Sequence, residues 1–354
     1  MAKPIIASQS FTQRKIMVWF LVLLLTEPPV PALEIKLENR GMYLDRIEFG
    51  RVRILRDGSF LANTFHHIWH WDERGGLINQ LGGYGQGPGE LEAMSEVLFD
   101  GRIYWAIDGA RMLSVLFDKA GNFLFNAKTN IRQFVRTPDR LFVVDNSKFG
   151  PAAGPYPRTL QEVSYQLTPE ELRITKRPLA FRKITPRQAE LGNTFKLLWV
   201  VRDSDRYFVM DQIEPRIQVF DADTRDQEQK ISDQKSYLPP QIPLRLPHWV
   251  APPAAMRHDF RSNDTLLTWW YSWSRVTFFG RMAEDLLVIY EVPDPQNPRG
   301  FLSAVTRIGE DGRPRGRTLL VEGQAVGAKE GLALVFQSGG NPDRFDYFIR
   351  GYRL

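Results

Sequence analysis

The chain has 354 residues, and its 43% hydrophobic and 12% aromatic content supplies ample material for a core. Its net charge is +5, of which residues 1–32 (Lys3, Arg14, Lys15 and Glu27) hold +2; the +3 left for 322 residues does not indicate a nucleic-acid-binding protein. The absence of cysteine excludes disulfides, thiolate metal sites and a cysteine nucleophile.

The N-terminus has the three parts of a secretory signal peptide. Arg14 and Lys15 end a basic leader, Ile16–Leu25 is an unbroken apolar run, and Val30-Pro31-Ala32 supplies a cleavage sequence. The run is too short to span a bilayer, which takes about 20 residues. We therefore expect cleavage after Ala32, a mature single domain over residues 33–354 without a membrane span, and a periplasmic or secreted location. An uncleaved membrane anchor is the alternative.

Short apolar runs separated by turn residues predict strands along the whole mature chain. Leu33–Leu37 alternates apolar and charged residues, which indicates a strand with one exposed face. Ile103–Ile107 has no polar face, so it should be buried on both sides. The predicted units of several strands are Arg51–Leu81, Leu81–Phe125, a third from Ile131 with Leu141–Asp145 as its inner strand, Phe195–Ile231, Leu266–Val321 and Ala325–Leu354.

The spacing of these units predicts a ring of sheets. Turns that begin at Asp72 and Asp118 lie 46 residues apart, a period typical of propeller blades. A four-stranded sheet with two apolar faces needs a similar sheet on each side, and a closed ring provides this. We predict an all-β, six-bladed β-propeller of four-stranded antiparallel blades, in which Leu33–Leu37 completes the last blade. A seventh blade results if Leu266–Phe279 belongs to a blade of its own.

Two segments interrupt the rhythm of strands. Lys148–Pro157 is rich in Gly, Ala and Pro, and Ser236–Ala255 has six prolines in 20 residues. That proline content rules out a central strand, because proline cannot donate to the ladder. We expect both segments to be long surface loops.

Two kinds of segment resemble known propellers. Ile103–Leu124 and Tyr207–Thr224 look like the NHL-type repeat, with an apolar strand, Val-x-Asp, a short turn and Ile-x-Val-Phe-Asp. Leu81–Met94 (LGGYGQGPGELEAM) is similar to the Gly-x-Gly-Pro-Gly-Glu interblade segment of exported bacterial six-bladed β-propeller proteins. The resemblance covers blades one to four well and the last two weakly. It implies the fold and no reaction, since that group is largely without assigned activity.

Three aspartates recur at equivalent places in the predicted blades. Asp108, Asp145 and Asp211 end the inner strand of three successive blades, which places them near one mouth of the channel. Converging carboxylates there can hold a cation such as calcium. The competing interpretation is that each aspartate caps its own turn.

Aromatic and histidine clusters supply the other candidates. Trp269, Tyr271 and Trp273 share one face of a predicted strand, which suits stacking on a sugar or peptide, although core packing is the competing interpretation. His66 and His70 share a strand face but lie about 13 Å apart, too far for one zinc without other ligands.

The sequence contains no nucleophile-elbow or metalloprotease motif, so we assign neither a catalytic residue nor a metal ligand. We expect a monomeric, non-catalytic binding or scaffold propeller without a cofactor. It recognises a protein or peptide, not nucleic acid, through loops at the channel mouth. The alternative is a calcium- or zinc-dependent hydrolase or lyase with its site at the central channel.

Overall fold

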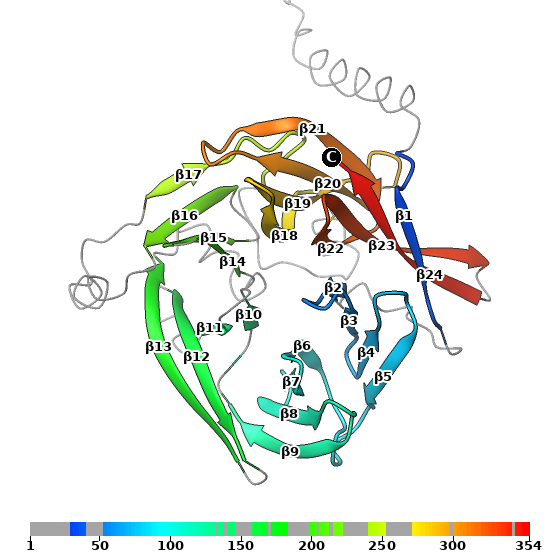
Figure 1. Cartoon of the computed structure of the whole chain (residues 1–354), viewed down its shortest axis with the longest axis vertical. Coiled ribbons are helices and arrows are strands. Elements are labelled where there is room, and N and C mark those ends of the chain that lie inside the picture. Colours follow the sequence, from blue (N-terminus) through cyan, green and yellow to red (C-terminus); the bar gives the residue numbers. More distant parts are fainter. Residues whose placement is uncertain are drawn as a thin grey trace, which may run out of the picture.

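The computed structural model describes residues 29–39, 52–129, 131, 134–136, 141–145, 158–168, 171–182, 198–203, 205–211, 215–221, 240–252, 271–297, 300–341 and 344–354. These residues form six four-stranded antiparallel sheets arranged in a ring (Figure 1). The predicted all-β, six-bladed propeller is therefore confirmed, and the described strands form no seventh blade. Over the same residues, no helix has the length and apolarity needed to cross a bilayer.

Strands follow one another within each blade in chain order. Blade one consists of β2 (Val52–Ile54), β3 (Phe60–Asn63), β4 (His67–Trp71) and β5 (Leu77–Gly82). Blade two consists of β6 (Met94–Phe99), β7 (Ile103–Asp108), β8 (Leu113–Asp118) and β9 (Phe123–Lys128). Blade three consists of β10 (Phe134–Arg136), β11 (Leu141–Asp145), β12 (Arg158–Leu167) and β13 (Leu172–Arg182). Blade four consists of β14 (Leu198–Asp203), β15 (Arg206–Asp211), β16 (Arg216–Asp221) and β17 (Gln241–Pro243). Blade five consists of β18 (Arg275–Met282), β19 (Asp285–Pro293), β20 (Phe301–Ile308) and β21 (Pro314–Glu322). Blade six consists of β22 (Gln324–Lys329), β23 (Leu332–Asn341), β24 (Arg344–Arg353) and β1 (Leu33–Leu37).

Strand β7 shows why the blades must stack. All six of its residues are buried. Tyr104 and Ala106 belong to the core between blades one and two, whereas Trp105 and Ile107 belong to the core between blades two and three. Successive side chains of a strand point to opposite faces, so the unbroken apolar run fills two cores at once.

The N-terminal strand closes the ring, as predicted. Strand β1 pairs antiparallel with β24, with Leu33 opposite Gly351 and Leu37 opposite Tyr347. Its buried Leu37 joins the core between blades six and one. The last blade thus takes its fourth strand from the other end of the chain.

A glycine turn docks each of three blades on the outer strand of the blade before it. Gly75, Gly121 and Gly312 all have positive φ. A Cβ on Gly75 would lie 2.1 Å from the carbonyl oxygen of Lys36, and one on Gly312 would lie 2.3 Å from that of Pro243. Only glycine combines this φ with so close a backbone approach.

Residues 240–252, the described part of the proline-rich segment, belong to the ring, which corrects their prediction as a surface loop. Gln241–Pro243 forms β17, the outermost strand of blade four, where proline is tolerated because the edge needs fewer donors. Leu244 and Leu246 then join the core between blades four and five. Lys148–Pro157 and residues 266–270 lie outside the described residues.

We predict that Gly75→Ala destabilises the protein far more than Gly101→Ala. Both glycines have φ near +90°, but no heavy atom lies within 4 Å of a Cβ on Gly101. Alanine at Gly101 should therefore cost about 1 kcal/mol of unfolding free energy from backbone strain alone. Alanine at Gly75 should cost roughly 3 kcal/mol, because overpacking against Lys36 adds to that strain. Urea unfolding of both variants checks this; equal losses would contradict the docking role of Gly75.

Candidate functional site

The three predicted aspartates end the second strand of their blades. Asp108, Asp145 and Asp211 close β7, β11 and β15, and the innermost strands are β6, β10 and β14. This corrects their prediction as inner-strand residues. Asp108 is paired with Met94, the first residue of β6, and Asp211 with Leu198, the first residue of β14. Their backbones therefore lie at equivalent levels, while the side chains of Asp145 and Asp211 fall outside the described structure.

The Asp108 carboxylate is completely occupied by hydrogen bonds. Its Oδ2 accepts the backbone N–H of Glu92 at 2.8 Å and the Nε–H of Arg111 at 2.7 Å. Its Oδ1 accepts the backbone N–H groups of Ala93, Ala110 and Arg111 at 3.1–3.3 Å. A carboxylate offers about four acceptor positions, so these five donors leave none for a cation. For Asp108 this geometry favours the turn-capping interpretation.

Asp108 remains ionised in this environment. Burial alone would raise the pKa of its carboxyl, but the N–H of Glu92 and the guanidinium and backbone of Arg111 outweigh that effect. The pKa of Asp108 is therefore lower than usual. A buried aspartate of this kind acts as a fixed negative anchor.

The segment that Asp108 anchors is the glycine-rich crossing between blades one and two. Arg111 Nη2 donates to the carbonyl of Glu90 at 2.5 Å, and Glu90 Oε2 accepts the N–H of Gly87 at 2.7 Å. A Cβ on Gly85 would lie 2.1 Å from the same Glu90 oxygen. The glycines of the Gly-x-Gly-Pro-Gly-Glu motif thus make room for the glutamate to fold back over the loop.

Two exposed apolar side chains accompany this crossing, and the sequence analysis missed both. Tyr84 is 73% exposed, and its ring packs edge-on against His66 at 4.8 Å between centroids. His66 Nδ1 lies 3.1 Å from the carbonyl of Leu91, which forms a bridge with Tyr84. Met112, 50% exposed with a positive φ, follows Arg111 in the anchored turn. The sequence feature that could have indicated this surface is Tyr84, an aromatic residue between two glycines.

The predicted aromatic platform surrounds a buried arginine. Trp273 is fully buried, and Tyr271 is half-buried against Phe301 at 4.7 Å. The Arg275 guanidinium lies over the Phe301 ring at 4.3 Å and over the Trp273 ring at 5.4 Å. Trp269 lies outside the described residues. Of this set, Trp273 presents no face to a ligand and packs as core.

Arg275 forms an ion pair that the sequence analysis did not anticipate. Its Nη2 and Nε donate to Glu291 Oε2 at 2.6 and 3.1 Å. Burial lowers the pKa of Arg275, and Glu291 only partly compensates. In the strand register, Glu291 lies opposite Arg275, the first residue of β18, just as Asp108 lies opposite Met94, the first residue of β6. The signal was a glutamate directly after the buried run Leu286–Tyr290.

The histidines of β4 and its approach do not gather into one site. His70 is buried, with Nδ1 2.6 Å from the Tyr104 hydroxyl and Nε2 2.9 Å from the Ser59 hydroxyl. Ser59 donates to Asp57 at 2.5 Å, and Asn79 donates to Tyr104 at 2.9 Å. Over the described residues, no three His, Asp or Glu side chains are placed to hold a metal ion.

These contacts determine where the proton of His70 lies. The Ser59 hydrogen is committed to Asp57, so Ser59 can only accept from His70 Nε2–H. Nδ1 must then be the unprotonated nitrogen that accepts from Tyr104. A second proton on Nδ1 would leave the Tyr104 hydrogen without this acceptor.

We predict that His70 makes the protein less stable in mild acid. Burial lowers the pKa of His70, and Asp57 offsets this only in part. A folded pKa below the unfolded value of about 6.5 means that the stabilisation is complete above that pH and declines as pH falls below it. The loss of unfolding free energy between pH 7.5 and 5.5 should be smaller in His70→Gln. Equal losses in both proteins would contradict the lowered pKa of His70.

We also predict that Asp108→Asn costs roughly 3 kcal/mol at pH 7, since it leaves the Arg111 guanidinium buried without a counter-charge. The folded pKa lies below the unfolded value of about 3.9, so this advantage is present above pH 4 and is lost as pH falls through the folded pKa. Denaturant unfolding at pH 7 and pH 3 checks this, with Glu330→Gln, at an 80% exposed side chain, as control. A pH-independent difference would contradict the ionised anchor.

No protein-family model matches the sequence, and no curated protein matches it. The resemblance to NHL-type repeats therefore stays a prediction. Among solved structures, the chain is similar to a protein of Bacteroides fragilis assigned provisionally as exported, with a TM-score of 0.52 and 12% identity over 93% of this chain and 98% of the other. It is also similar to a member of the DUF4221 family from Bacteroides vulgatus, with a TM-score of 0.54 and 10% identity over 92% and 97%. At these identities the likeness shows the fold.

Proposed function

We propose that this protein is an exported, non-catalytic propeller that binds a peptide segment of a partner protein. The basic and apolar leader supports export, and so does the fold shared with the Bacteroides fragilis protein assigned provisionally as exported. The protein acts in the periplasm or outside the cell as a monomer, without a cofactor. Nucleic acid is not its ligand.

The proposal moves recognition away from the long proline-rich segment. Residues 240–252 supply an outer strand and two core leucines, so they are not free to form a binding loop. The crossing between blades one and two is better suited. It carries Tyr84 and lies beside the anchored turn after β7, which carries Met112.

The observation that carries the proposal is that Tyr84 is exposed on a crossing whose backbone is held by hydrogen bonds. A tyrosine offers a large apolar surface with a hydroxyl at its tip, and such residues dominate the binding energy of many interfaces. The crossing is held by the contacts of Glu90 and Arg111. Little conformational freedom is then lost when a ligand packs on Tyr84, which favours affinity.

The chemistry-bearing groups of this region have structural partners, which supports binding over catalysis. Asp108 anchors the crossing, and His70 lies in a buried chain between Ser59 and Tyr104. A general base or nucleophile must reach a substrate, and neither of these two groups is exposed.

We predict that peptides selected from a displayed random library on the immobilised protein bind at Tyr84. Tyr84→Ser should raise their Kd by a factor of roughly 30, the effect of losing about 2 kcal/mol at an aromatic anchor. Ile78→Ser is the matched control, because Ile78 is 49% exposed but lies on β5. Fluorescence anisotropy with a labelled peptide measures both variants.

The same experiment can reject the proposal. Peptides that bind Tyr84→Ser and the wild type equally would place recognition elsewhere. A stoichiometric calcium or zinc ion in the purified protein, with a hydrolytic activity lost in Asp211→Ala, would support the metal-dependent enzyme instead.

A further inference from the structure

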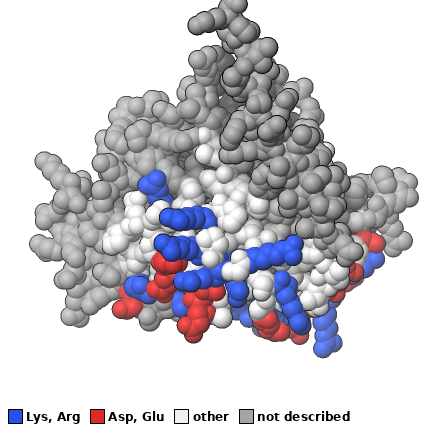
Figure 2. Space-filling view, turned by 90° about the horizontal axis from the view of Figure 1, so that it is seen from above, with Lys and Arg blue, Asp and Glu red and all other residues white. Residues whose placement is uncertain are grey.

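Arginines gather at the outer corner of blade five, where β20 turns into β21. Arg206 reaches this turn through Glu310 at 3.1 Å, and the backbone N–H of Arg245 donates to Gly312 at 3.1 Å. Figure 2, which views the rim that carries β21, shows several Lys and Arg side chains side by side, with Asp and Glu side chains interspersed among the lower ones. We call this set the arginine corner: Arg206, Arg245, Arg307, Arg313, Arg315 and Arg317.

Two of these arginines face each other across neighbouring strands. Arg307 on β20 is paired directly with Arg315 on β21. Like charges directly opposite each other in a sheet are destabilising. The nearest carboxylate oxygens lie 3.9 Å from Arg307, on Asp285, and 3.5 Å from Arg315, on Asp311. Both distances exceed that of an ordinary hydrogen bond, so each guanidinium keeps donors for another acceptor.

The rest of the arginine corner is also short of negative charge. Asp311 serves both Arg313, at 4.0 Å, and Arg315, whose side chains are 67% and 55% exposed. Arg245 and Arg317 have no ion-pair partner among the described residues. Six arginines thus stand against four carboxylates: Asp205, which precedes Arg206, and Asp285, Glu310 and Asp311. On the neighbouring β18–β19 turn, Arg281 and Glu284 balance each other.

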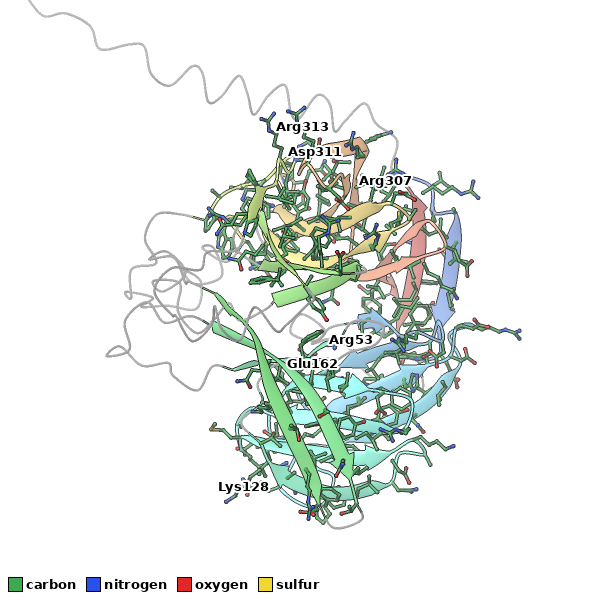
Figure 3. The ribbon with its side chains drawn as sticks, turned by 60° about the vertical axis from the view of Figure 1, so that its left-hand side comes forward. Arg53, Lys128, Glu162, Arg307, Asp311 and Arg313 are labelled. Carbon is green, nitrogen blue, oxygen red and sulfur yellow. The ribbon has the colours of Figure 1, made fainter. Side chains whose placement is uncertain are left out.

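The shape and chemistry of the corner fit an extended anion. Figure 3 places Arg313 and Asp311 at the outer rim and Arg307 farther along the same blade. Guanidinium groups bind sulfate and carboxylate through paired, planar hydrogen bonds. Arg313 ends the β20–β21 turn and Arg315 lies two residues later on β21, so these two exposed side chains can contact successive charges of one chain.

Two other polyanions fit less well. None of the exposed large apolar side chains among the described residues lies on β20, β21 or their turn, so the corner offers no wedge for a bilayer. It also offers no exposed aromatic ring on which nucleic-acid bases could stack.

We propose that the arginine corner of blade five binds a linear acidic polysaccharide through its sulfate or carboxylate groups. This site is separate from the Tyr84 surface, so either proposal can fail without the other.

The test measures the Kd of a short, labelled heparin fragment at about 0.1 M salt, which screens charges nearly as strongly as physiological salt does. The variant Arg313→Gln/Arg315→Gln/Arg317→Gln should weaken binding roughly tenfold, since each exposed charge contact contributes less than about 1 kcal/mol. The control Arg56→Gln/Arg74→Gln/Lys119→Gln removes the same charge from exposed positions of blades one and two. This control should change the Kd less than about twofold, because its three charges lie far from the arginine corner and are screened by salt.

A single substitution separates binding from structure. Arg315→Gln relieves the like-charge pair with Arg307, so it should leave Tm unchanged or raise it while weakening heparin binding. A lowered Tm with unchanged Kd would show that Arg315 is structural and would overturn the proposal.

The remaining outcomes also decide the matter. No heparin binding, or equal weakening by both triple variants, would contradict the arginine corner as a site. Binding to duplex DNA or to vesicles of anionic phospholipid that is tighter than binding to heparin would assign the corner to that ligand instead.

Discussion

Each blade has two apolar faces, and neither can be buried without a neighbouring blade. Strand β7 makes this plain, because Tyr104 and Trp105 are adjacent in sequence but belong to different cores. The ring therefore depends on close approach between blades. The glycine turns at Gly75 and Gly312 allow that approach, since any side chain there would meet a backbone carbonyl. The crossing on which Tyr84 is displayed is held by other contacts, those of Asp108, Arg111 and Glu90.

The sequence predicts the blades where apolar runs are unbroken and turns are regular. Ile103–Ile107 and the turns at Asp72 and Asp118 were sufficient to predict the fold, and the closing strand followed from its alternation. Strand β17 was missed because an edge strand of three residues needs little apolar pattern and tolerates proline. Asp108 was found by its recurrence, but two of its five donors, the N–H groups of Glu92 and Ala93, come from the crossing about 15 residues upstream, a contact that only the fold creates.

Charged groups fall into two classes. Inside the ring they are matched: Asp108 with Arg111, Arg275 with Glu291, and Arg53 of β2 with the buried Glu96 of β6. The first pair joins β7 to its following turn, the second joins β18 to the neighbouring strand β19, and the third joins blade one to blade two. Breaking such a pair leaves the remaining charge without a partner. On the outer corner of blade five, arginines outnumber carboxylates and one cross-strand pair is repulsive. That imbalance distinguishes this corner from the interior.

Closure by β1 has a consequence for the order in which the chain folds. Of the described strands, the first in the chain pairs with the last, so Leu33 must wait for Gly351 before the final sheet is complete. Contacts between residues so far apart in sequence form slowly, because a long loop must close before they are made. Until then, the apolar side of Leu37 and the face of blade one that packs on it stay uncovered. The interface between blades six and one is therefore the last part of the ring to be buried.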